Sequence, residues 1–233
     1  MSKEKFFDCI FNKLPSKNAS FHECMDIKNN FIPEKLYKYT KAKYAEELLV
    51  KNLIYLPTID ELNDLYEARV FLNNKKIRDE LNKNVNLNRF SKNMGDNVIS
   101  ELLSNFSDDI SKDYSQEFSV ICLSENNCIN PMWGNYADKY RGICLEYNLK
   151  DTKEKYFRDF CFPIKYVKRE ADFEQIKSNE SFVLNNIPFE PLLKKSFDWN
   201  YEEEWRIIIH KPSLKEIINE TKIDDKIKEH LLV

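Results

Sequence analysis

The spacing of apolar and polar residues predicts a chain that contains both helices and strands. Apolar residues recur at helical spacing over 42–51, and residues 1–34 indicate one or two short helices. Helical spacing returns over 173–193, where Pro188 and Pro191 interrupt it. Dense or alternating apolar runs predict strands at 36–39, 53–56, 118–123, 142–147, 160–167 and 205–209. Because helices and strands do not alternate regularly, we expect an α+β fold with a mixed β-sheet core.

One long stretch is expected to be an insertion of amphipathic helices. From Ile77 to Tyr114, apolar side chains recur at helical spacing in an otherwise polar segment. This places a helical insertion at about 73–117 within a core at about 35–210. The tail opens with a capping box of Ser213 and Glu216, which predicts a closing helix over 213–231. The chain has no internal repeat and no break in composition, so we expect a single domain over 1–233.

The composition argues against several classes of function. The 36 basic and 39 acidic residues give a formal charge of −3, which disfavours a surface built for duplex nucleic acid. The three glycines, Gly95, Gly134 and Gly142, are too far apart for a Rossmann or Walker phosphate loop. No apolar run approaches the roughly 20 residues of a membrane helix. The first residues lack the layout of a signal peptide, so we expect a cytoplasmic protein with no membrane partner.

The cysteines and histidines do not predict a metal site. The six cysteines form no C-x-x-C pair, and the three histidines are far apart in the sequence. Zinc ligands normally come in close pairs, so no metal is predicted. Cys122 and Cys144 stand among apolar neighbours and are interpreted as small buried hydrophobic residues, although a Cys–His nucleophile pair stays an alternative.

Two polar clusters occur in the first third of the chain. Lys38 lies between two tyrosines, Tyr37 and Tyr39, in the first predicted strand and is followed by Thr40. It is either an edge residue whose ammonium reaches solvent or a ligand-binding cation. The second cluster is a turn that contains Asn63, Asp64 and Glu67. These residues either close the turn through side-chain hydrogen bonds or place acids at the mouth of a pocket.

A third cluster, residues 130–142, contains two of the three glycines and three aromatic residues. Trp133, Tyr136 and Tyr140 are spaced to lie on one face of a short helix. We interpret Trp133 as a core residue and leave Tyr136 open between the core and a stacking surface for a base or nicotinamide. Arg141 ends this cluster.

The fourth cluster, residues 199–206, gives the sharpest pattern. In a strand, Trp205, Ile207 and Ile209 face the core. The opposite face then carries charge, from Glu202, Glu204 and Arg206. This face is either a charged edge that prevents aggregation or a site in which Glu204 contacts a ribose or a cationic transition state and Arg206 orients it.

Together these clusters resemble a large bacterial and phage-associated family, the domain of unknown function twenty-nine seventy-one. The resemblance spans roughly 35–210, with the insertion as its variable part, and it implies no particular activity. It rests on Leu36 to Thr40, Leu53 to Asp64 with Glu67, Phe118 to Glu125, Pro131 to Tyr147, and Trp199 to Arg206.

More remotely, the chain resembles the ADP-ribosyltransferase fold. Lys38 stands where that fold has a His or Arg in its first strand, and Glu202 to Glu204 supply its late Glu-x-Glu. The likeness implies NAD as substrate, with Glu204 as the catalytic carboxylate and Glu202 as its partner. The residues expected to bind substrate are Lys38, Tyr39, Thr40, Tyr55, Asn63, Asp64, Glu67, Ser124, Trp133, Tyr136, Arg141 and Arg206.

Three functions therefore stay open at this point. The first is an NAD-consuming transferase or glycohydrolase, such as a toxin or phage-defence effector, which acts on a protein, a nucleic acid or water. The second is a nuclease in which Asp64, Glu67, Glu202 and Glu204 gather around Mg²⁺ with Lys38 near the phosphate. The third is a non-enzymatic interaction domain whose aromatic residues around Trp133 and Trp199 bind a partner.

Overall fold

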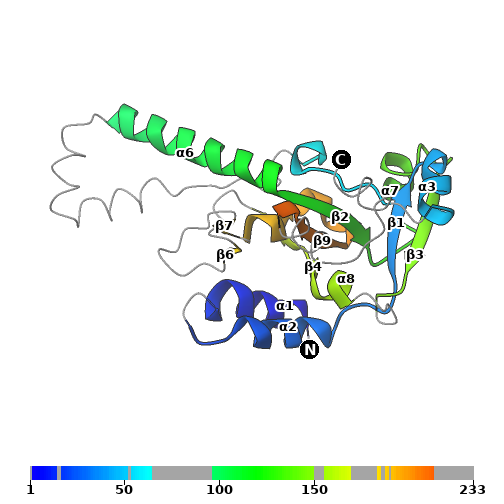
Figure 1. The fold of residues 1–233 in the computed structure, drawn as a ribbon, viewed down its shortest axis with the longest axis horizontal. Helices are drawn as coiled ribbons and strands as arrows, with labels where there is room; N and C mark the ends of the chain where they lie inside the picture. The colour runs from blue at the N-terminus through cyan, green and yellow to red at the C-terminus, as the bar shows by residue number, and fades with distance from the viewer. Residues whose placement is uncertain are drawn as a thin grey trace.

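A computed structural model gives the fold for most of the chain (Figure 1). It describes residues 2–14, 17–51, 54–64, 96–149, 155–168, 183–184, 187–188 and 190–212. The helices and helical turns are α1 Lys3–Asp8, η1 Cys9–Lys13, α2 Phe21–Asn29, η2 Ala42–Tyr44, α3 Ala45–Leu49, η3 Ile59–Glu61, α6 Asp96–Glu117, α7 Asn130–Asn135, α8 Lys155–Asp159, η4 Glu190–Leu193 and η5 Phe197–Glu202. The strands are β1 Leu36–Thr40, β2 Phe118–Ser124, β3 Ile143–Tyr147, β4 Cys161–Pro163, β5 Lys165–Val167, β6 Val183–Leu184, β7 Ile187–Pro188, β8 Lys194–Ser196 and β9 Glu204–His210.

A five-stranded sheet in the order β3-β1-β2-β9-β4 forms the centre of the molecule. Its neighbouring strands are antiparallel, while β5 and β8 form a separate parallel pair, so both strand directions occur. The α+β class is confirmed. The predicted run 160–167 is divided at Ile164, because β4 belongs to the large sheet and β5 to the parallel pair.

Two of the predicted elements are wrong where the structure describes them. Residues 54–57 form no strand but lie against β2, where the Val120 N–H donates to the Pro57 carbonyl at 3.2 Å. Proline has no N–H with which to continue a ladder, which is the physical reason for the difference. The helix expected over 173–193 is instead replaced, in the described residues, by the antiparallel pair β6–β7 and the single 3₁₀ turn η4.

The two faces of the central sheet are covered differently. Helices α1 and α2 pack beneath one face, where Phe6 and Cys9 join Val120 and Ile208 in a buried cluster (Figure 1). On the other face, Trp205, Ile207 and Ile209 are buried, as their alternation predicts, among residues such as Leu36 and Ile121. Each fully buried side chain of this kind contributes roughly 1.5–3 kcal/mol.

A disulfide that the cysteine spacing does not predict joins the two N-terminal helical segments. Cys9, at the start of η1, bonds Cys24 of α2, and both residues are buried in the same cluster as Phe6. A capping box of Ser20 and Glu23 fixes the start of α2. The cross-link therefore holds the pair of helices in register against the sheet.

The predicted helical insertion is seen in part. Helix α6 runs directly into β2, and Figure 1 shows it extending away from the sheet. Residues 73–95 of the insertion and the expected closing helix over 213–231 lie outside the described residues. Within the described part of the chain, no helix is both long enough and apolar enough to span a membrane.

Candidate functional site

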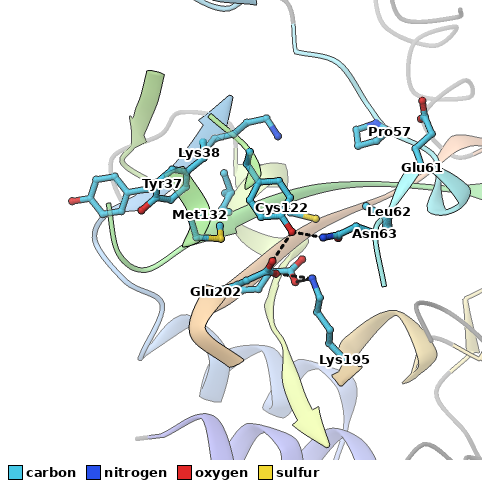
Figure 2. Close-up of a pocket in the computed structure, with 14 residues that line it drawn as sticks. Tyr37, Lys38, Pro57, Glu61, Leu62, Asn63, Cys122, Met132, Lys195 and Glu202 are labelled. Atoms are coloured by element: carbon cyan, nitrogen blue, oxygen red, sulfur yellow. Dashed lines mark hydrogen bonds and ion pairs between the residues drawn. The ribbon is translucent and has the colours of Figure 1, made fainter. Parts of the chain in front are cut away.

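The candidate site is a cavity that forms where strands β1 and β2 separate. The two strands pair at a single register position, Tyr37 opposite Ser124. The next residues, Lys38 and Tyr39 on β1 and Leu123 and Cys122 on β2, do not pair with one another, although each strand keeps its other neighbour, and they line a cavity of about 220 Å³ (Figure 2). The full lining is Tyr37, Lys38, Tyr39, Pro57, Glu61, Leu62, Asn63, Cys122, Leu123, Met132, Tyr136, Lys195, Glu202 and Glu204.

A buried ion network forms one wall of the cavity. The Lys195 ammonium lies between two carboxylates, 2.6 Å from Glu202 Oε2 and 2.9 Å from Glu204 Oε2. Arg206 holds Glu204 from behind, with Nε 2.7 Å from Oε1 and Nη2 3.2 Å from Oε2. The side chains of all four residues are at most 4% exposed. The two acids and two bases therefore neutralise one another out of contact with water.

The backbone fixes the spacing of the two carboxylates. Glu202 ends η5, Glu203 adopts a left-handed conformation with φ 46°, and Glu204 begins β9. The Ser124 hydroxyl donates to the Glu202 carbonyl at 2.7 Å, and the Glu125 N–H donates to the Glu203 carbonyl at 3.2 Å. The last residue of β2 and the residue after it therefore hold this turn in place.

A tyrosine and an amide extend the network into the cavity. Tyr136 donates its hydroxyl proton to Glu202 Oε1 at 2.5 Å, and the Asn63 side-chain amide donates to the Tyr136 oxygen at 2.6 Å (Figure 2). Each oxygen of Glu202 therefore accepts one hydrogen bond, from a neutral phenol and from a lysine. By contrast, Glu204 accepts three hydrogen bonds from cationic side chains.

Burial and the neighbouring charges shift the pKa values of this network. Burial alone would lower the pKa of Lys195, but Glu204 and Glu202 outweigh it and raise that pKa. Burial raises the pKa of Glu202, and Lys195 opposes this shift. Burial and the nearby Glu202 raise the pKa of Tyr136, so its phenol keeps the proton. The arrangement thus holds a protonated lysine and a neutral phenol against one carboxylate.

Lys38 lies in the cavity apart from this network. Within the described part of the chain it makes no hydrogen bond or ion pair. Burial lowers the pKa of Lys38, while Cys122 and Glu204 act in the opposite direction. The sequence interpretation of Lys38 as an edge residue that reaches solvent does not fit this position, because its side chain faces the cavity (Figure 2).

The face of Glu204 and Arg206 is not an exposed charged edge, which corrects that interpretation. Strand β9 lies between β2 and β4, and both side chains are buried. Arg206 also donates to the Leu192 carbonyl at 3.0 Å, and burial lowers its pKa to about 9, with Asp64 opposing the shift. Asp64 accepts the Ser196 N–H at 3.2 Å. Arg206 and Asp64 thus support the cavity wall from behind instead of lining it.

The other predicted residues are spread around the cavity. Tyr39 lines it, although its hydroxyl donates to the Asn126 carbonyl at 2.7 Å. Tyr55, 68% exposed, donates to Glu61 at the rim. Neither Thr40 nor Ser124 is among the lining residues. The exposed Arg141 pairs with Asp138, away from the lining, and Glu67 lies outside the described residues.

The aromatic residues expected on one helix face separate in the structure. Helix α7 ends at Asn135, and Tyr140 follows in a left-handed turn with φ 67°. Trp133 is half-buried and packs edge-on against Tyr39 with ring centroids 5.3 Å apart, beside the buried cluster that contains Tyr39. Trp199 is the second centre of the expected partner surface. The Lys195 ammonium lies over its ring, 5.2 Å from the ring centroid. Each indole therefore has a contact within the chain.

Sequence reasoning did not identify Lys195, the residue that joins the two carboxylates. The signal available was a pair of lysines directly after the buried Leu192 and Leu193. The predicted helix over 173–193 ended just before these lysines. Strand β8, which contains Lys195, is only three residues long and polar, so its sequence does not predict a strand. Among the described residues, no group of three His, Cys, Asp or Glu side chains is arranged to hold a metal ion.

One segment of the chain, which carries part of the site, resembles a known sequence family. Residues 132–207 match the family model described as Protein of unknown function (DUF2971). This stretch contains Tyr136, Lys195, Glu202 and Glu204 but not β1. No curated protein and no solved structure matches the chain. The resemblance to the domain of unknown function is therefore supported over these residues.

Proposed function

We propose that the cavity binds NAD and that its carboxylates promote cleavage of the bond between nicotinamide and ribose. The observation that carries this proposal is the pair Glu202 and Glu204 in the wall of a cavity that is also lined by Tyr37, Tyr39 and Tyr136. Cleavage of that bond develops positive charge on the ribose, and a fixed carboxylate stabilises charge of this sign. Aromatic side chains provide surfaces against which a nicotinamide ring can pack.

Of the two carboxylates, Glu202 is the better candidate to face the ribose. Lys195 and Arg206 surround Glu204 with three charge-assisted hydrogen bonds, which offset its negative charge. Glu202 shares Lys195 and otherwise accepts from the neutral Tyr136. The sequence-based expectation gave Glu204 the catalytic role. The contacts favour Glu202 in that role, with Glu204 as a positioning residue.

The proposed reaction follows the pattern of other ribosyl transfers. The bond between the ribose C1′ atom and the nicotinamide nitrogen breaks, and both electrons leave with nicotinamide, which becomes neutral. An acceptor then forms a bond to C1′ and loses a proton. With water as acceptor the products are ADP-ribose, nicotinamide and a proton. A protein or nucleic-acid acceptor would make the chain a transferase.

The remote likeness to the ADP-ribosyltransferase fold supports the same proposal. Lys38 of the first strand and the late pair Glu202 and Glu204, far apart in sequence, line one cavity. A toxin or phage-defence role is proposed on the phage-associated resemblance alone.

The test is release of nicotinamide from NAD by the purified chain and by a matched pair of glutamine variants. Glu202→Gln removes the charge inside the cavity, whereas Glu203→Gln changes the adjacent, exposed glutamate. We expect Glu202→Gln to lower the rate by about 10²-fold or more, and Glu203→Gln to leave it unchanged. Thermal melting confirms that both variants are folded. Wild-type turnover in Glu202→Gln would remove this carboxylate from the mechanism.

A further inference from the structure

We infer that Lys38 is the anion-binding group of the cavity, so that its ligand is a phosphate-bearing nucleotide and not a neutral nucleoside. This inference rests on the proposed function for the identity of the nucleotide. It adds a distinct chemical requirement, a negatively charged group placed on the β1 side of the cavity.

Every other charged side chain that lines the cavity is engaged. Glu202 and Glu204 share Lys195, and Glu61 accepts the Tyr55 hydroxyl and, at 2.8 Å, the Thr58 N–H. Lys38 has no such partner in the described part of the chain. An ammonium group taken out of water without a counter-ion is costly, so this position favours an anionic ligand.

No second cation among the described residues is placed to take this role. Arg206 was the other cation expected to position substrate, but it is fully buried behind Glu204 and bound to the Leu192 carbonyl. Lys195 is already paired with two carboxylates. Of the lysines and arginines in the lining, this leaves Lys38 to meet a phosphate.

The position of Lys38 also sets the direction of the ligand. Figure 2 shows Lys38 and Lys195 on different sides of the cavity, with Cys122 between them in the view. A ligand whose ribose lies at Glu202 therefore places its anionic group toward the part of β1 that does not pair with β2. This matches a molecule with its phosphates on one side of a ribose and its leaving base on the other.

Proton uptake gives an independent signature of the contact. Burial lowers the pKa of Lys38, with Cys122 of β2 and Glu204 of β9 as the nearest opposing groups. A bound anion stabilises the protonated form and raises this pKa again. Binding at alkaline pH should therefore take up a proton. The other titratable groups of the lining are Tyr37, Tyr39, Glu61, Tyr136, Lys195 and Glu202.

The experiment compares ADP, inorganic pyrophosphate and adenosine by titration calorimetry in buffers of different ionisation enthalpy. We expect Lys38→Met to weaken ADP and pyrophosphate by about tenfold or more, to leave adenosine unchanged, and to abolish proton uptake. Lys38→Arg, which keeps the charge, should retain most of the affinity. Lys41→Met, at an exposed position on the same segment, is the matched control and should bind as the wild type does. Equal ADP affinity in Lys38→Met and wild type would overturn the inference.

Activity measurements separate this inference from the proposed function. If NAD is not cleaved but ADP binding depends on Lys38, the proposed function fails and the anion site stands. If nicotinamide riboside, which lacks phosphate, is cleaved as fast as NAD by both wild type and Lys38→Met, the function stands and the anion site fails.

Discussion

At the scale of single residues, the main feature is charge that is buried and paired. The alternation along 202–206 correctly placed Glu204 and Arg206 opposite Trp205, because side-chain direction in a strand follows from the sequence. It could not reveal that this face is covered, since burial depends on the contacts that η4 and β8 make with β9, which alternation within one strand does not encode. Lys195 was missed for the same reason. A buried lysine is recognisable only once its acidic partners are known.

Lys28 gives a prediction at this scale. It is fully buried, its ammonium donates to the carbonyls of Arg158 and Asp159 at 2.6 and 2.9 Å, and burial lowers its pKa to about 8 from 10.5. At pH values between the folded and the unfolded pKa of Lys28, the unfolded chain binds a proton that the folded chain has lost. The free energy of unfolding therefore rises with pH over this range. The full effect is about 3 kcal/mol.

Urea denaturation at several pH values between about 7.5 and about 10 measures this dependence, because this interval covers most of the range between the two pKa values of Lys28. We expect the wild type to gain stability over this range relative to Lys28→Met, in which the titrating group is absent. Lys5→Met, at an exposed position of α1, should keep the wild-type dependence. Parallel pH curves for Lys28→Met and wild type would contradict the assigned shift.

At the scale of elements, the sequence predicted best where apolar side chains are dense. The predictions for β1, β2, β3 and β9 agree with the structure, because their runs of β-branched and aromatic residues suit a buried sheet. The errors fall on segments whose backbone is governed by proline or by tertiary contacts, at 54–57, 183–184, 187–188 and 190–193. The cavity forms because β1 and β2 separate, and the sequence of neither strand by itself predicts this separation.

Gly142 tests how tightly the turn between α7 and β3 is packed. A Cβ atom on Gly142 would lie 2.2 Å from the Thr40 carbonyl oxygen and 2.7 Å from Ala137 Cα. We expect Gly142→Ala to lower the free energy of unfolding by about 2 kcal/mol, because backbone atoms must move. Gly134→Ala is the matched control, since its Cβ would meet nothing closer than 3.8 Å. Equal stability of the two variants in urea would contradict this packing.

At the scale of the whole molecule, the cavity is lined by segments that are far apart in the sequence. Strand β1 supplies Lys38, and the segment matched to the unknown-function family supplies Tyr136, Lys195 and the carboxylates. The α+β class was accessible from the sequence because element types average over many residues. The order of the strands was not, because pairing between distant segments leaves no local pattern.

The Cys9–Cys24 disulfide gives a prediction for the stability of the whole molecule. It closes a loop with a sequence separation of 15, for which the expected stabilisation is about 3 kcal/mol. A reducing agent should lower the free energy of unfolding of the wild type by this amount, and a Cys9→Ala/Cys24→Ala variant should not respond to it. Cys128→Ala, which removes an exposed free thiol, should respond as the wild type does. A wild type indifferent to reduction would contradict the cross-link.

The single register pair between β1 and β2 also has a consequence for folding. Because β1 and β2 pair with each other only at Tyr37 and Ser124 in the described sheet, the β1–β3 ribbon joins the remaining strands through a narrow seam. Such a seam is the natural boundary of a local opening reaction, in which the ribbon detaches while β2, β9 and β4 stay together. A ligand that spans the cavity would bind both sides of this seam. It would therefore slow hydrogen exchange in β1 and β3 more than in the rest of the sheet.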